Sequence, residues 1–327
     1  MSNTSAIRPD AWTRWISLDM QFPAAAKPPV GIVFDSAMAR IDDVLALAML
    51  HGFDGKDQAR IAAVAVSSGD LRAAQFCDAV GHFYASATTG TAAMFMHFTP
   101  IGLADGKPTA ESTMFGNLAY PNSIKSINGT ADPATLIRNA LMAQYDQNAA
   151  VVLSGPATDL ARLLDMYGVK DWITRKVRLL CVAEPAIQAD AAAAEKVFAD
   201  WPTPIVTVGR DIGEALPFPG DSIEKDFAYS SAHPVVDAYR AYEPMPYDAP
   251  SWAMAAMLYA INPNDGYFKL SGSGNRRDLL LDPEQKERII RTYIEMASAK
   301  PVPRKPRRPP DEKKDAKKDE KKEDEKK

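Results

Sequence analysis

Residues 30–50 read VGIVFDSAMARIDDVLALAML, and this stretch decides the fold class. Its first part, 30–34, is apolar and is followed by Asp35, a pattern typical of a strand that is buried on both faces. Asp42 and Asp43 then come directly before an apolar run, which indicates a helix that starts with acidic residues. A short buried strand joined by a tight loop to an apolar helix is the repeating unit of a parallel α/β sheet.

The alternation of short strands and helices continues from this stretch to about residue 210. Beyond residue 215 it stops, and the pattern predicts helices only, while the polar segment 99–130 predicts a long loop. The expected strands are 30–35, 61–67, 91–98, 151–154, 176–183 and 205–208, and the expected helices are 42–52, 71–84, 156–166, 190–200, 234–242, 250–260 and 283–298, with one more starting at 132–133.

We therefore predict an α/β fold with an open, mostly parallel, doubly wound sheet, helices on both faces and a helical C-terminal layer. The sequence has no internal repeat and no linker before residue 300, which favours one domain over residues 28–300. Residues 1–27 are then an N-terminal extension, and residues 301–327 are a charged tail. Residues 304–327 hold 12 Lys/Arg and 8 Asp/Glu without apolar periodicity, so we expect disorder there. The alternative is a docking arm for a protein partner.

Charge and composition exclude several classes of function. The net charge is −4, and outside residues 304–327 the chain holds 26 Lys/Arg and 34 Asp/Glu, which disfavours nucleic acid as a partner. No apolar run approaches the ~18 residues of a membrane-spanning helix. The first residues show no secretory signal, and Cys77 and Cys181 lie inside apolar segments. We expect reduced, buried thiols in a cytoplasmic protein.

Standard cofactor and nucleophile motifs are not found in the sequence. It has neither G-x-G-x-x-G nor G-x-x-x-x-G-K-[ST], which excludes an ordinary dinucleotide or P-loop site. Residues 271–274, SGSG, lack the G-x-S-x-G frame and are expected to form a turn. The four histidines, His51, His82, His97 and His233, are scattered without the spacing of metal ligands.

The candidate functional residues are Asp35, Asp42 and Asp43. Ligands of open α/β sheets bind beyond the carboxyl ends of the strands, where Asp35 is expected to lie. Three carboxylates around one strand–loop–helix turn could hold a hard cation or a substrate. The alternative is structural, since Asp at a helix start caps free N–H groups and stabilises the helix dipole.

Four segments resemble a known family. Residues 34–47, FDSAMARIDDVLAL, resemble the N-terminal signature of inosine/uridine-preferring nucleoside hydrolases, roughly D-x-D-x-G-x-D-D-A-x-A. Residues 152–161, VLSGPATDLA, are similar to the G-P-L-T-N-L-A turn of that family. Residues 189–198, ADAAAAEKVF, resemble its D-P-x-A-A helix, and residues 245–254, MPYDAPSWAM, resemble the P-Y-D-x-x-x-W-D motif of a divergent bacterial branch. The segments keep the family's order and cover about residues 28–300.

The resemblance implies a calcium ion at the carboxyl edge of the sheet, which holds the ribose hydroxyls while water attacks the N-glycosidic carbon. Asp43 matches a metal ligand, and Asp42 matches a carboxylate that holds the ribose. Asp35 matches an aspartate that supports the metal site, and the backbone carbonyl of Ser154 matches a further metal contact. The resemblance also implies a ribose-containing small molecule, such as a nucleoside, as ligand, and a homo-oligomer.

Three further residues are candidates for substrate contact. Glu184 lies where the family has the residues that hold the ribose, in a segment that looks shortened. Trp252 and Tyr247 would line a pocket that stacks a nucleobase, or would be core aromatics. Two other acidic residues, Asp159 and Asp248, are expected to be helix caps.

Two positions depart from the family pattern at the metal site. Ala37 stands where the family has a metal ligand and presumed base, and Ala253 stands where it has a metal-binding Asp. Arg40 places a positive charge near the metal position. Losing two of three carboxylates should lower the affinity for a hard cation ~10³-fold or more, and losing the base should cost ~10²–10⁴ in rate. We therefore expect calcium to be lost and name no catalytic residue.

The leading hypothesis is a nucleoside hydrolase-like protein with weak or no N-glycosidase activity, a degenerate pseudoenzyme retained for ligand binding or assembly. One alternative is an active ribonucleoside N-glycosidase with a rebuilt site that uses Asp35, Asp42, Asp43 and Glu184. The other alternative is a structural or scaffold protein that acts through its charged C-terminal tail.

Overall fold

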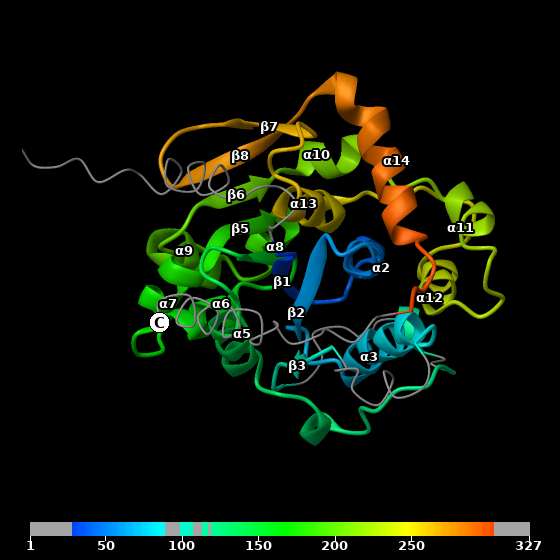
Figure 1. Cartoon of the computed structure of the whole chain (residues 1–327), viewed down its shortest axis with the longest axis horizontal. Coiled ribbons are helices and arrows are strands. Elements are labelled where there is room, and N and C mark those ends of the chain that lie inside the picture. The colour runs from blue at the N-terminus through cyan, green and yellow to red at the C-terminus, as the bar shows by residue number, and fades with distance from the viewer. Residues whose placement is uncertain (1–27, 89–98, 107–112, 117–118, 304–327) are drawn as a thin grey trace, which may run out of the picture.

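One sheet organises the chain, as the computed structural model shows (Figure 1). The described residues are 28–88, 99–106, 113–116 and 119–303. Among them, eight strands pair in the order β3-β2-β1-β4-β5-β6-β8-β7, all parallel except the antiparallel pair β7 and β8. The strands are β1 (Val30–Ser36), β2 (Ala59–Val66), β3 (Ile101–Leu103), β4 (Ala149–Leu153), β5 (Val177–Ala183), β6 (Ile205–Val208), β7 (Phe268–Ser271) and β8 (Arg276–Leu281).

The strands at the centre of the sheet are covered on both faces. Every residue of β1, β4 and β5 is buried, as expected for parallel strands between two layers of helices. In the register of the sheet, Asp35 near the end of β1 pairs with Ala65 of β2 and with Leu153 of β4. The carboxyl ends of three neighbouring strands therefore meet around Asp35.

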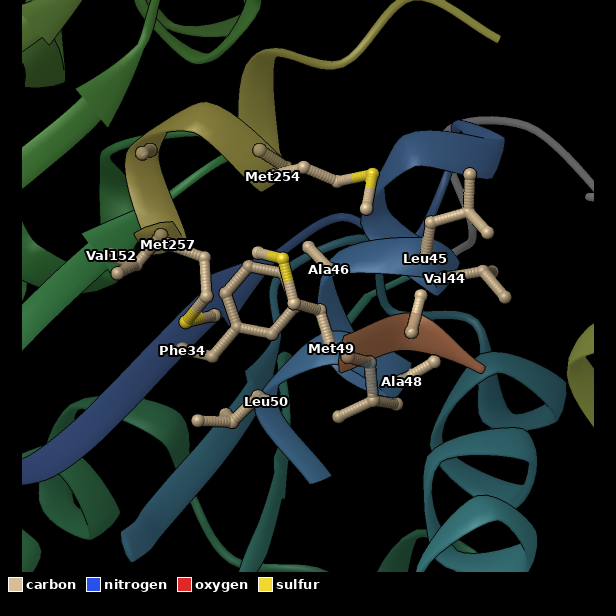
Figure 2. Packing of buried hydrophobic residues seen from close by; sticks show 14 of the residues in the cluster. Phe34, Val44, Leu45, Ala46, Ala48, Met49, Leu50, Val152, Met254 and Met257 are labelled. Atoms are coloured by element: carbon tan, nitrogen blue, oxygen red, sulfur yellow. The ribbon is translucent and has the colours of Figure 1, made fainter. Parts of the chain in front are cut away.

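One face of the sheet carries an apolar layer that includes the C-terminal helices. The helix α13 is apolar along its whole length because it is enclosed between β4, β5 and α2. Figure 2 shows this core, in which Phe34 of β1 lies beside Met49 of α2 and Met257 of α13. The helices of this layer are α2 (Ile41–Gly55), α3 (Leu71–Ala85), α12 (Pro234–Tyr242), α13 (Trp252–Ile261) and α14 (Lys286–Ala297).

A second layer covers the opposite face. Side chains alternate along β1, so Val33 packs in the second layer whereas Phe34 packs in the first. The helices of the second layer are α5 (Pro133–Met142), α6 (Thr158–Leu164), α7 (Val169–Lys176), α8 (Glu184–Ala189) and α9 (Ala191–Asp200). Short connecting helices are α10 (Arg210–Ala215) and α11 (Asp221–Lys225), together with the 3-10 turns η1 (Thr113–Phe115), η2 (Ile127–Gly129) and η3 (Pro283–Gln285).

The predicted α/β class, with its mostly parallel sheet between helices, is confirmed. The predicted start of α5 is also confirmed, because the Asp132 carboxylate accepts the N–H of Thr135 and Pro133 is the first helical residue. The predicted strand 91–98, the N-terminal extension 1–27 and residues 304–327 of the predicted tail 301–327 lie outside the described residues.

Two local predictions were wrong, and one short helix was not predicted. The segment interpreted as a loop contains β3, a short edge strand that pairs with β2. The region beyond residue 215, where only helices were predicted, also contains the β7–β8 hairpin. This hairpin is half-exposed and lacks the continuous apolar run of a buried strand. Residues 184–189 directly after β5, for which no helix was predicted, form α8. The turn predicted at 271–274 is confirmed: it joins β7 to β8, with Gly272 at φ 88° and Gly274 at φ 79° in the left-handed region.

Two features of the structure concern the predictions about membrane spans and cysteines. No helix in the described part of the chain is long and apolar enough to cross a membrane. Cys77 and Cys181 are buried free thiols, as expected, and burial raises the pKa of both well above that of an exposed cysteine.

Candidate functional site

The candidate site lies where β1 ends and α2 begins. Residues 37–40 turn the chain between the two elements, so that Asp42 and Asp43 fall in the first turn of α2. Met38 in this turn has φ 51°, a backbone conformation that glycine adopts most easily, and its N–H donates to Ser36 Oγ at 2.9 Å. The turn makes Arg40 the residue that directly precedes the helix.

The Arg40 side chain contacts both carboxylates and a neighbouring strand end. Its Nε donates to Asp42 Oδ1 at 3.0 Å, and its Nη2 donates to Asp43 Oδ1 at 3.1 Å. The same Nη2 donates to the backbone carbonyl of Ser154, directly after β4, at 3.3 Å. One guanidinium therefore joins the start of α2 to the carboxyl end of the adjacent strand.

Each of the two carboxylates also accepts backbone N–H groups. Asp43 Oδ2 accepts the N–H of Ala39 and that of Arg40, both at 3.2 Å, and so fixes the turn before the helix. Asp42 Oδ2 accepts the N–H of Ala253 at 2.9 Å and thereby satisfies a free donor in the first turn of α13. The pair thus links the turn, α2 and α13.

Burial and neighbouring charges oppose each other at these groups. Burial raises the pKa of Asp43 to about 6, against the lowering effect of Arg40 and with a smaller rise caused by Asp42. Burial would lower the pKa of Arg40, but the two carboxylates raise it above its ordinary value. Arg40 therefore stays charged at every physiological pH, and Asp43 is mostly ionised at neutral pH.

Asp35 is fully buried beneath the turn. Neither of its carboxylate oxygens has a hydrogen-bond partner among the described residues, and the same holds for the hydroxyls of Ser67 and Ser154. Burial raises the pKa of Asp35 well above its usual range, the charge of Asp159 raises it further, and the nearby Ser67 opposes the rise. Burial therefore shifts the protonation equilibrium of Asp35 towards the neutral acid.

Two predicted helix caps have other roles. Asp248 accepts the N–H of Gly220 at 2.8 Å, and Ser251 is the residue that precedes α13, so the prediction that Asp248 caps this helix was wrong. Asp159 lies inside the first turn of α6, after Ala157 at the cap position, and it pairs with Arg162 at 3.2 Å.

The other predicted substrate contacts make bonds of their own. Glu184 begins α8 after β5, and its Oε1 accepts from Gln188 at 3.4 Å. The indole of Trp252 donates to the backbone carbonyl of Arg210 at 3.1 Å and packs on Gly213, where a Cβ atom would overlap the ring. No hydrogen bond among the described residues joins Glu184 or the Trp252 side chain to the carboxylate pair.

Tyr247 is held by a second tyrosine. Its ring stacks on that of Tyr239 with centroids 4.4 Å apart. Tyr247 donates its hydroxyl to the Tyr239 carbonyl at 2.6 Å, and Tyr239 donates to the Tyr247 carbonyl at 2.7 Å. These reciprocal bonds favour the packing role over nucleobase stacking.

The residues present do not fit a calcium ion in this arrangement. Calcium takes about six to eight oxygen ligands, mainly carboxylates and carbonyls. Asp43 Oδ1 and the Ser154 carbonyl, which the family resemblance assigns to the metal, accept from Arg40 instead. Ala37 and Ala253 supply no carboxylate. Within the described ranges, no group of three or more His, Cys, Asp or Glu side chains is placed to hold a metal ion.

Sequence reasoning missed the central role of Arg40. It placed a positive charge near the metal position but did not predict that the guanidinium would contact Asp42, Asp43 and Ser154 together. The available signal was a single basic residue two positions before two adjacent aspartates. Such a residue can pair with them only if the turn aims it back over the helix start.

Comparison with solved structures identifies similar folds. The inosine-uridine preferring nucleoside hydrolase from Bacillus anthracis aligns with a TM-score of 0.58 at 12% identity, over 83% of this chain and 99% of that protein. The purine-preferring ribonucleoside hydrolase from Gardnerella vaginalis aligns with a TM-score of 0.61 at 13% identity, over 82% and 98%. The type III effector protein XopQ, complexed with adenosine diphosphate ribose, aligns with a TM-score of 0.61 at 12% identity, over 89% and 99%.

Sequence comparison adds no family assignment. No family model matches the sequence, and a search of curated proteins found no match. At 12–13% identity the structural likeness shows the fold alone. The chain has the fold of the nucleoside hydrolases.

Proposed function

We propose that this protein binds a ribose-containing small molecule at the carboxyl edge of its sheet and does not hydrolyse N-glycosidic bonds with the help of calcium. The observation that carries this proposal is the bonding of the two retained carboxylates, Asp42 and Asp43, to Arg40. Ala37 and Ala253 stand at the other two acidic positions of the family pattern.

Two groups that metal-assisted hydrolysis requires, a bound cation and a base, have no suitable residues at this edge of the sheet. A metal-assisted hydrolase needs a cation to bind the sugar and acidify water, and a base to accept the proton. The methyl group of Ala37 accepts no proton, and Ala253 contributes its backbone N–H to Asp42 rather than a carboxylate to a metal. Asp35, the carboxyl group on β1, is fully buried, and burial raises its pKa.

Arg40 offers a means of binding without a metal. Its side chain is 24% exposed, whereas those of Asp42 and Asp43 are 1% and 0% exposed. The Nη1 group makes no hydrogen bond among the described residues, so its two N–H donors can serve a ligand. Sugar hydroxyls are suitable acceptors, and the two carboxylates beneath disfavour an anion at this spot. The structural neighbour complexed with adenosine diphosphate ribose supports a ribose-containing ligand.

The test is a binding and turnover experiment with ribose, inosine, uridine and adenosine diphosphate ribose. We expect calorimetry to detect binding of at least one compound, unchanged by EDTA, with no release of base when calcium is added. Arg40→Gln should weaken this binding at least tenfold. Arg60→Gln, which removes an arginine with a similar 28% exposure from another carboxylate pair, should leave it unchanged.

Two results would contradict the proposal. Base release on the order of 1 s⁻¹ or faster in calcium would mean that an active site has been rebuilt, with Asp35, Asp42, Asp43 and Glu184 as its acidic residues. Failure of all four compounds to bind would remove the proposed ligand class.

A further inference from the structure

Three oxygen atoms from two separate parts of the chain accept hydrogen bonds from one positively charged side chain. Asp42 Oδ1 and Asp43 Oδ1 come from the first turn of α2, and the Ser154 carbonyl comes from the end of β4. We infer that the Arg40 guanidinium is a built-in cation that takes the place of a divalent metal ion at this edge of the sheet. Calcium then has access to these oxygens only when Arg40 is removed.

The charges of the two carboxylates require such a cation. Asp42 and Asp43 are neighbours in the sequence, and their side chains are 1% and 0% exposed. Water cannot screen two adjacent carboxylates at that depth, and a buried charge without a partner is strongly destabilising. Arg40 is the only Lys or Arg in the described part of the chain that forms an ion pair with either of them.

The shape of the guanidinium suits three acceptors that lie in different directions. Its Nε serves Asp42, while the two N–H groups of Nη2 serve Asp43 and the Ser154 carbonyl. Lysine would present a single ammonium and could not reproduce this planar fork. The backbone N–H of Arg40 also donates to Asp43 Oδ2, so the residue is held at both of its ends.

The turn before α2 is built to aim this side chain. Met38 adopts φ 51° although it is not glycine, and its side chain is fully buried in the first layer of the core. The buried methionine anchors the turn at a backbone conformation that an L-residue rarely adopts. Two residues later, Arg40 therefore begins from a fixed position next to the carboxylates.

This inference deepens the proposed function, on which it rests for the identification of the edge as a former metal site. Its test uses no nucleoside or sugar. A failure to bind ribose-containing compounds would therefore leave the inference intact, and a failure of the test below would leave ligand binding intact.

The experiment measures thermal unfolding of the full chain and of Arg40→Gln with and without millimolar calcium chloride, against sodium chloride at equal ionic strength. We expect the Tm of the unsubstituted protein to be the same in both salts. Arg40→Gln should lower the Tm by several degrees in sodium chloride, and calcium should restore at least half of that loss. Calorimetry should detect calcium binding to Arg40→Gln and none to the unsubstituted protein.

The matched control is Arg60→Gln. Arg60 also pairs with two carboxylates, Asp54 and Asp57, and has a similar exposure. Asp54 is 1% exposed but Asp57 is 78% exposed, so water solvates the second charge when the arginine is removed. We expect a smaller loss of Tm in this variant and no restoration by calcium.

Three outcomes would overturn the inference: calcium binding to the unsubstituted protein, an unchanged Tm in Arg40→Gln, or a lowered Tm that calcium does not restore. If Arg40→Gln does not fold, the folding of the double variant Arg40→Gln/Asp43→Asn tests the inference instead. Removing Asp43 together with the cation should return a folded protein, because the two buried carboxylates no longer face each other and the remaining one, Asp42, keeps the N–H of Ala253 as a donor. A double variant that also fails to fold would likewise overturn the inference.

Discussion

At the scale of single residues, the backbone segments of the candidate site approach each other at Gly155. A Cβ atom added there would overlap the backbone nitrogen of Ala37 and the Oγ of Ser67, and it would lie 2.8 Å from the carbonyl carbon of Ser36. Two of these three obstacles are backbone atoms, which cannot turn away as a flexible side chain would. The turn after β4 therefore needs glycine to lie beside the turn after β1.

We expect Gly155→Ala to lower the free energy of unfolding by about 1–3 kcal/mol, the usual range for forcing extra atoms into a packed region. Chemical denaturation of both proteins measures the difference. Gly129→Ala is the control, because its nearest neighbour would be Ile124 Cα at an ordinary 3.6 Å. Equal stability of Gly155→Ala and the unsubstituted protein would show that the turn has more room than the structure gives it.

The residues that gather at this edge could be predicted from the sequence, but their bonds could not. Asp35 and Ser154 could be placed at this edge because they lie at the ends of predicted strands, and parallel strands bring their carboxyl ends to one edge. Asp42 and Asp43 could be placed there because they lie at the start of the next predicted helix. The contact of Asp42 with the Ala253 N–H joins residues 211 positions apart and depends on how α13 packs. No local pattern specifies that contact or the direction of the Arg40 side chain.

At the scale of elements, His233 caps α12 in a form that only the neutral ring can maintain. Its Nδ1 accepts the N–H of Val235 at 3.3 Å, and its Nε2 lies 2.9 Å from the Tyr229 hydroxyl. The ring is enclosed by aromatic side chains, among them Phe83 and Phe227. Burial lowers the pKa of His233 to about 4. A second proton would sit on Nδ1, where it would face the Val235 N–H instead of accepting it.

The sign of the resulting pH dependence follows from the lowered pKa. The unfolded chain takes up the proton near pH 6.5 and the folded protein only near 4, so this contribution to stability is complete above pH 6.5 and is lost as the pH falls towards 4. Between pH 7 and pH 5 we expect His233 to cost about 2 kcal/mol of unfolding free energy. Asp43, whose pKa is raised to about 6, acts in the opposite direction over part of this range.

A comparison of variants isolates the histidine from the other titrating groups. His233→Asn keeps an acceptor for the Val235 N–H but does not titrate, so its stability should fall less between pH 7 and pH 5 than that of the unsubstituted protein. Parallel curves for His233→Asn and the unsubstituted protein would rule out a neutral, buried His233.

Elements that bury a continuous apolar run could be predicted, and elements that depend on their neighbours could not. β1 and α2 carry their own signal because nearly every residue is apolar or caps the helix start. β3 has three residues and β8 begins with two arginines, so neither has the pattern of a buried strand. Both are strands because adjacent strands supply their hydrogen-bond partners.

At the scale of the whole molecule, burial decreases along the sheet from its centre to the hairpin edge. Every residue of β4 and β5 is buried, whereas β7 and β8 each bury a single residue. The central strands also pair on both sides and are covered by both helical layers, while β7 pairs with β8 alone among the described strands (Figure 1). Opening the centre therefore exposes both layers of the core, and opening the hairpin exposes little apolar surface.

Hydrogen exchange followed by mass spectrometry should reproduce this gradient. We expect peptides that cover β1, β4 and β5 to exchange only through global unfolding, with protection that rises and falls with the total stability of each variant described above. Peptides that cover residues 268–281 should exchange at least tenfold faster, through local opening of the hairpin, and should not respond to Gly155→Ala. Equal protection of the hairpin and the centre would mean that the sheet opens only as one unit, because local opening would then cost as much as unfolding the core.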